Sequence, residues 1–172
     1  MIRKRKLYQR PMKLYQKSRI EEENVWVKKY GLKNKKEIWK TLAKINYFRK
    51  RAKILTKASL EEQSTFFNYL RSLGLEIKST ADVLDLEVED LLKRRLPSVV
   101  VNIGLAHTPK QARQMIVHKK IIVGGNVVNI PSYIVPISLE SEIKIKSKSK
   151  TNKVSSDKKI RYLETTHNGS RN

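Results

Sequence analysis

Lysine, arginine and tyrosine side chains supply the clearest chemical pattern in this chain. The first twenty residues hold eight basic and no acidic side chains, with Tyr8 and Tyr15 among them, and a second basic run over residues 35–57 holds Tyr47. Guanidinium and ammonium groups bind phosphate oxygens, and aromatic rings stack on unpaired bases. The pattern predicts a surface for a sugar–phosphate backbone and an N-terminal arm that becomes ordered along phosphates.

Other chemistries lack the residues they need. The chain has no cysteine, and His107, His118 and His167 do not have the spacing of metal ligands. Gly124 and Gly125 indicate a turn, since no phosphate-cradling glycine motif surrounds them. We therefore expect no catalytic residue, no metal site and no cofactor, and the chain is predicted not to be an enzyme.

The overall charge favours a polyanionic partner. The chain has 172 residues, with 38 Lys and Arg against 16 Asp and Glu, and a formal net charge of +22. In so small a protein the basic side chains repel one another unless an anionic partner neutralises them. Nucleic acid is the first candidate for that partner. Residues 61–92 reverse the sign, with eight acidic and two basic side chains. Two basic surfaces joined by an acidic helical segment, which faces solvent or a basic protein neighbour, are predicted.

An anionic membrane is the second candidate partner, and the sequence argues against it. Residues 121–139 carry no charge, but they contain Gly124, Gly125, Pro131 and Pro136, which break a helix. Short strands and turns are predicted there. The basic start MIRKRK is not followed by an apolar signal core, so we expect neither secretion nor a membrane partner.

Capping patterns predict the helices of the N-terminal half, over residues 19–30, 35–57 and 60–73. In each pattern an N-cap side chain precedes a glutamate by three residues, and Gly31 and Gly74 follow the first and third helices at left-handed C-terminal positions. The capping pairs are Ser18 with Glu21, Asn34 with Glu37, and Ser59 with Glu62.

The helix predicted over 35–57 has two distinct faces. Its apolar face is Ile38, Leu42, Ile45, Phe48, Ala52 and Leu55. Lys and Arg side chains cover the other face, and no acidic residue occurs between Glu37 and Glu61 to pair with them. We therefore expect this basic face to bind phosphates.

The second half reads as a mixture of helix and strand. Residues 80–96 predict one or two short helices, and Thr108 with Gln111 caps a basic helix that starts at Pro109. Residues 121–131 predict a hairpin and residues 143–146 a further strand. The fold class is thus α+β and mainly helical. We expect a helical domain at 1–93, a second domain with a small β-hairpin or sheet at 94–146, and a disordered tail at 147–172.

Two segments of the second half carry a family resemblance. RRL at 94–96 and GLAHTPKQARQMIVHKKIIVGGNVVNIPSYIV at 104–135 closely resemble the S-four RNA-binding domain, an α-L-shaped unit of two packed helices and a β element. In the first half, YQRPMKLYQKSRIEEEN, KYGLKNKKEIWK and ADVLDLEVEDLLKRRL resemble the S-four family of small-subunit ribosomal proteins, in its archaeal and eukaryotic branch. The resemblance covers roughly residues 7–146.

The resemblance implies a fold and a role. A helical domain would pack against the α-L domain to give one continuous RNA-binding surface. The protein would be a structural constituent of the small ribosomal subunit in the cytoplasm, binding 16S-type rRNA early and nucleating assembly of the subunit body. It would lie beside ribosomal protein five and messenger RNA near the entry channel, support translational accuracy, and form no obligate homo-oligomer.

The candidate RNA-binding residues come from two sources. The basic and aromatic patterns, with the helix cap and the basic residues after the helix, supply Arg3, Arg5, Tyr8, Arg10, Lys36, Lys40, Lys44, Tyr47, Lys50, Arg51, Thr108 and Lys120. The resemblance adds Arg94, Arg95, Lys110, Arg113, Gln114, His118, Lys119, Ser132 and Tyr133. Two positions depart from the family pattern: Lys119 stands where glycine is usual, and Pro97 where glutamine is usual.

Two other functions remain open from the sequence. One is an RNA-modifying enzyme, such as a pseudouridine synthase, that uses the S-four domain for docking. The other is a stand-alone S-four-domain factor that binds ribosomes or structured RNA transiently.

Overall fold

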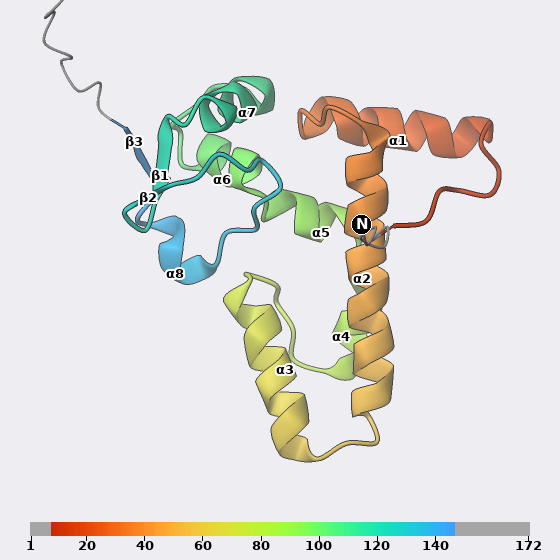
Figure 1. Cartoon of the computed structure of the whole chain (residues 1–172). Coiled ribbons are helices and arrows are strands. Elements are labelled where there is room, and N and C mark those ends of the chain that lie inside the picture. The colour runs from red at the N-terminus through yellow and green to blue at the C-terminus, as the bar shows by residue number, and fades with distance from the viewer. Residues whose placement is uncertain (1–7, 147–172) are drawn as a thin grey trace, which may run out of the picture.

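The computed structural model describes residues 8–146 of the chain. The predicted contacts of Arg3 and Arg5 and the predicted tail at 147–172 lie outside the described residues. Figure 1 shows a mainly helical molecule with one small sheet, so the predicted α+β class is confirmed. The elements are α1 (Lys17–Lys29), α2 (Lys35–Leu55), α3 (Leu60–Ser72), α4 (Thr80–Asp85), α5 (Val88–Lys93), α6 (Leu96–Asn102), α7 (Pro109–Val117), β1 (Ile121–Val123), β2 (Asn126–Val127), α8 (Ile137–Glu140) and β3 (Lys144–Ile145).

Helix α2 is the long axis of the molecule, and α3 returns alongside its C-terminal half (Figure 1). Ile45 and Phe48 of α2 are buried against Phe66 and Leu70 of α3, and α4 and α5 close the same core. The predicted apolar face of α2 is confirmed except at Leu42, which is 43% exposed. Burial of this stripe fixes which face of α2 remains for binding.

Helix α1 crosses the N-terminal end of α2 (Figure 1) and is joined to the rest by two carboxylates. Glu89 of α5 accepts hydrogen bonds from Trp26 Nε1 (3.0 Å), Lys29 Nζ (2.9 Å) and Tyr30 OH (3.2 Å). These contacts, that of Lys29 first, hold the pKa of Glu89 below its ordinary value. The acidic segment 61–92 was expected to face solvent or a basic neighbour, but Glu89 of this segment binds side chains of its own chain.

Glu23 is the second carboxylate, buried between α1 and α2. It accepts from Arg19 Nη1 (3.0 Å) and Trp39 Nε1 (2.9 Å), and Lys35 Nζ lies 3.3 Å from its other oxygen. Because a buried charge is costly without such partners, these contacts explain how a glutamate is tolerated in this position.

The C-terminal part packs α6 and α7 against a three-stranded antiparallel sheet of order β2-β1-β3. Ile121 and Val123 of β1 lie in the core with Ala112 and Ile116 of α7. The uncharged segment 121–139 thus forms short strands and turns, as predicted, and also enters the single helical turn of α8, which was not predicted. Across residues 8–146, no helix combines the length and the apolar character that a membrane crossing requires.

Several predicted helix boundaries are confirmed and others are wrong. Ser59 and Thr108 cap α3 and α7 by accepting from backbone N–H groups, and Gly31 and Gly74 have positive φ. Ser18 does not cap α1, because the helix already begins at Lys17 after Gln16. Asn34 precedes α2 without a side-chain capping bond.

Candidate nucleic-acid interface

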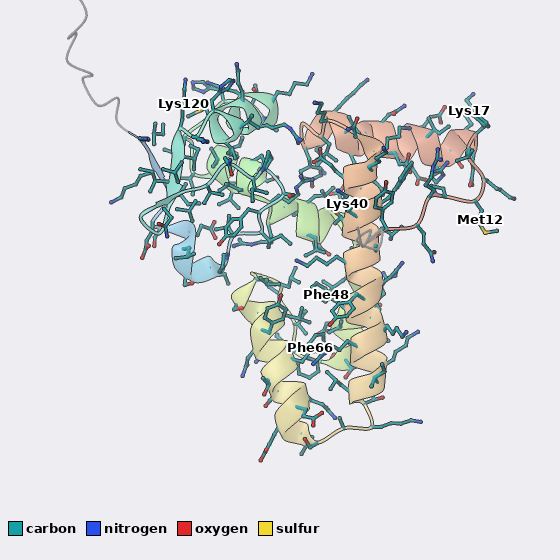
Figure 2. All side chains as sticks on the ribbon, in the orientation of Figure 1. Met12, Lys17, Lys40, Phe48, Phe66 and Lys120 are labelled. Atoms are coloured by element: carbon teal, nitrogen blue, oxygen red, sulfur yellow. The ribbon has the colours of Figure 1, made fainter. Side chains whose placement is uncertain are left out.

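A cavity of about 400 Å³ is lined by five of the predicted RNA-binding residues. It lies between the two halves of the described molecule, residues 8–93 and residues 94–146. Lys40 and Lys44 come from α2, Arg113 from α7, Arg95 from the start of α6, and Ser132 from the loop before α8. Lys40 is labelled in Figure 2, on the side of α2 that faces α5. Residues distant in sequence thus form one largely basic hollow.

Glu37, in the first turn of α2, is the acidic residue among those that line this cavity. Arg113 donates two hydrogen bonds to it, Nη2 to Oε1 (2.8 Å) and Nη1 to Oε2 (3.1 Å), and Arg95 Nη2 donates to Oε2. Burial raises the pKa of Glu37, but the bonds from Arg113 and Arg95 outweigh it and hold that pKa below its ordinary value. The carboxylate therefore ties α2 to α6 and α7 while fixing the direction of both guanidinium groups.

The predicted basic pair Arg94 and Arg95 lies mostly inside the protein. Arg95 is 5% exposed and binds Glu37. Arg94 donates to the carbonyl oxygens of Leu73 and Val135 and to Glu140, each at 3.0 Å. In the structure both side chains hold the halves together, and their contact with RNA stays a prediction.

Helix α7 presents a second basic surface beside the cavity. Lys110, Gln114, His118, Lys119 and Lys120 are all exposed along α7 and the turn that follows it. Thr108, by contrast, has a local role, since its Oγ1 accepts from Gln111 N at 3.2 Å and starts the helix.

The end of α7 explains the unusual lysine at position 119. Lys119 has φ of 57°, its N–H donates to Ile116 O (2.9 Å), and the N–H of Lys120 donates to Met115 O (3.0 Å). These two bonds form a Schellman motif, in which the left-handed residue is usually glycine. The backbone therefore keeps the shape that glycine favours while a charged side chain is added.

The remaining candidates lie along α2 and its neighbours. Lys36 and Lys50 are exposed on α2, and Arg10 is exposed before α1. The Tyr8 ring lies tilted beside that of Trp39, with ring centroids 6.2 Å apart, and Lys40 Nζ lies 5.9 Å from the centre of the Tyr8 ring. Tyr8, the first described residue of the arm, thus lies beside the same helix that lines the cavity.

Three further candidates do not line the cavity. Tyr47 and Arg51 line a second hollow between α2 and α3. Tyr133 is partly buried against the C-terminal core.

Sequence reasoning missed two features of this site. Glu37 was predicted only as a capping residue, although a lone acid ahead of a long basic run is a signal for a shared counter-ion. Thr41 also lines the cavity, one turn after Glu37, with its hydroxyl donating to Glu37 O (2.9 Å). Between residues 8 and 146, no three acidic or histidine side chains come together as metal ligands would.

The fold and the basic hollow define an RNA-binding protein built around an S4 domain, and the family model described as "S4 domain" matches residues 94–140. Curated relatives extend the match to most of the chain. A small ribosomal subunit protein uS4 of Methanococcus aeolicus is 43% identical over 145 residues, covering 80% of this chain and 82% of the relative. The uS4 proteins of Methanothermobacter thermautotrophicus and Halobacterium salinarum are 41% and 40% identical, covering 81% and 80% of this chain and 85% and 83% of theirs. The chain belongs to the uS4 family of small ribosomal subunit proteins.

Proposed function

We propose that the chain is a structural constituent of the small ribosomal subunit that binds 16S-type rRNA directly. The observation that carries the proposal is the basic cavity, where α2, α6, α7 and residues 131–134 bring predicted RNA-binding residues from both halves together. The names of the relatives support the small subunit as its location, and therefore the cytoplasm. The family consists of ribosomal proteins and not of enzymes, so the pseudouridine synthase alternative is not retained.

The mechanism is phosphate neutralisation by a pre-shaped surface. Lys40 and the exposed lysines of α7 supply charge on both sides of the cavity, and Arg113 is held in one orientation by Glu37. A fixed guanidinium loses less side-chain entropy when a phosphate arrives than a mobile one does. Affinity then comes from charge, and register comes from the shape of the RNA.

The finer role follows the family resemblance. In this proposal the protein binds the rRNA early and nucleates assembly of the subunit body. It then lies beside ribosomal protein five near the messenger RNA entry, where the pair supports decoding accuracy. A stand-alone factor would associate transiently, so one copy per mature small subunit distinguishes the proposed role from that alternative.

The test is a footprint of the purified full chain on naked small-subunit rRNA, combined with a salt titration. If roughly six to ten phosphates are engaged, log affinity against log salt has a slope of about −5 to −9. Replacing Lys40 and Lys110 together by alanine should make the slope shallower by about 2. The matched control replaces Lys28 and Lys53, which are exposed and line neither this cavity nor the hollow between α2 and α3. A slope near zero, or the absence of a footprint, would overturn the proposal.

A further inference from the structure

A second hollow, of about 500 Å³, lies between α2 and α3 and is unusually aromatic. The rings of Phe48 and Phe66 lie between these two helices (Figure 2) and are buried, with centroids 6.4 Å apart. Tyr47 on α2 and Tyr69 on α3 also line the hollow, and they are 57% and 50% exposed. The hollow thus has an apolar aromatic base and a half-exposed tyrosine on each side.

Two cations lie near these rings, and one carboxylate, that of Glu62, also lines the hollow. Lys44 Nζ lies 5.7 Å from the centre of the Phe48 ring, and the Arg51 guanidinium lies 5.8 Å from that of Phe66. Among the residues that the structure describes, no carboxylate lies within 4.0 Å of either cation. Burial of Lys44 lowers its pKa, as expected for a cation that lacks a counter-ion.

The chemistry of the hollow selects its occupant. A ligand that satisfies it must offer a flat π surface to the tyrosines and negative charge to Lys44 and Arg51. A nucleotide carries both features on one unit, since its base stacks and its phosphate is anionic. An apolar peptide would leave both cations unpaired, and an acidic peptide would offer no ring to the tyrosines.

Lys44 also joins this hollow to the basic cavity, because it lines both. A strand whose phosphates follow the cavity therefore reaches the aromatic hollow directly. We propose that an unpaired RNA nucleotide inserts its base between α2 and α3, beside Tyr47 and Tyr69, and places its phosphate on Lys44. The inference rests on the proposed rRNA-binding function and adds to it a site that reads an extruded base.

The test compares two ten-nucleotide single-stranded RNA probes that differ only in their bases. One is a uridine decamer and the other is its abasic counterpart, so the number of phosphates is the same. Both are titrated with the full chain and followed by fluorescence anisotropy of an end label. We expect the uridine decamer to bind about tenfold more tightly, the scale of stacking one base on aromatic side chains.

Variants of the lining residues show which side chains cause the preference for the uridine decamer over the abasic one. Tyr69→Ala should remove most of it, whereas Tyr69→Phe keeps the ring and should preserve it. Thr65→Trp places a ring of the protein itself in the hollow and should abolish the preference without removing charge. Lys44→Met should weaken the binding of both probes. Lys53→Met should not, because Lys53 lies on the opposite side of α2. Thermal melting of each variant confirms that it is folded.

Each outcome decides between the proposals. Equal affinity for the two decamers, or a preference that survives both Tyr69→Ala and Thr65→Trp, overturns the base site. A polyglutamate decamer that displaces the RNA as effectively as unlabelled RNA does would show an acidic-peptide surface and also overturn it. If rRNA binding with its steep salt dependence persists in these cases, only the proposal of a base site is refuted. If rRNA does not bind either, the proposed function falls with it.

Discussion

Lys110 and Arg113, two basic residues on the same face of α7, have different roles in this molecule. Arg113 lies on the polar face of α7 with Lys110, so the sequence groups the two as RNA-binding residues. In the structure Lys110 is exposed, whereas Arg113 makes two hydrogen bonds to Glu37 across the junction of the two halves. A helix-face pattern identifies which side of α7 a residue lies on, but not whether a partner from another element already binds it.

This difference predicts separate effects of two alanine substitutions. Lys110→Ala should weaken rRNA binding and make the salt slope shallower by about 1, with no change in stability. Arg113→Ala should also weaken binding, but it should lower the free energy of unfolding by about 2 kcal/mol, because hydrogen bonds to a partly buried charge are lost. Urea unfolding and filter binding on both variants measure the two effects. Equal stability of the variants would contradict the structural role of Arg113.

At the scale of elements, the sequence predicted most helices because their signals are local. The burial of Ile38, Ile45 and Phe48 follows directly from the period of α2. The residue pattern did not predict helix α6, since its sequence LPSVVVN is rich in β-branched residues, which disfavour helix. Only the family resemblance implied a second helix in this part of the chain. Its helix is held by the tertiary core around Val99 and Val100, and such long-range packing is not visible in a local pattern.

The candidate site divides in the same way. The basic face of α2 and the capped helix α7 were predictable from composition and spacing. The cavity that joins them depends on the Glu37 contacts, and these bring together residues 58 and 76 positions apart. The aromatic hollow likewise needs Tyr69 of α3, which lies in the acidic interval 61–92 and was therefore not a candidate for phosphate binding.

The end of α7 supplies a prediction at this scale. Lys119 in a left-handed conformation is strained relative to glycine by about 1 kcal/mol. Lys119→Gly should therefore raise the free energy of unfolding by about that amount while weakening rRNA binding through the lost charge. Lys119→Ala is the matched control, because it removes the same charge and keeps the strain. Chemical denaturation should separate the two variants, and their RNA affinities should coincide; a stability gain in both would refute the strain.

At the scale of the whole molecule, ion pairs hold together surfaces that would otherwise repel. The two halves are each strongly basic, and the described structure places Glu37 and Glu140 where their cations meet. Gly31 supports the same junction, since a Cβ there would lie 2.9 Å from the backbone carbon of Pro109, at the start of α7. The proposed RNA-binding surface thus depends on two carboxylates at this junction, those of Glu37 and Glu140.

That dependence predicts how stability responds to acid. The pKa of Glu37 is lowered by folding, so its stabilising effect is complete above the ordinary value of 4.5 and is lost as pH falls through the folded value. Glu37→Gln, which keeps the shape without the charge, should be less stable than the unchanged protein by about 3 kcal/mol at pH 7, because Arg95 is left buried without an anion. Below pH 4.5 the two stabilities should begin to converge, and the gap should narrow further as pH falls towards the folded pKa, since a protonated Glu37 resembles glutamine.

Urea unfolding from pH 7 to pH 3 measures this convergence. Glu76→Gln is the matched control, because Glu76 is exposed and makes no ion pair among residues 8–146. Its stability should follow that of the unchanged protein throughout the titration. A constant gap between Glu37→Gln and the unchanged protein would mean that the carboxylate acts through packing and not through charge. The junction would then hold its shape in acid, and the guanidinium groups would keep their directions without an anion between them.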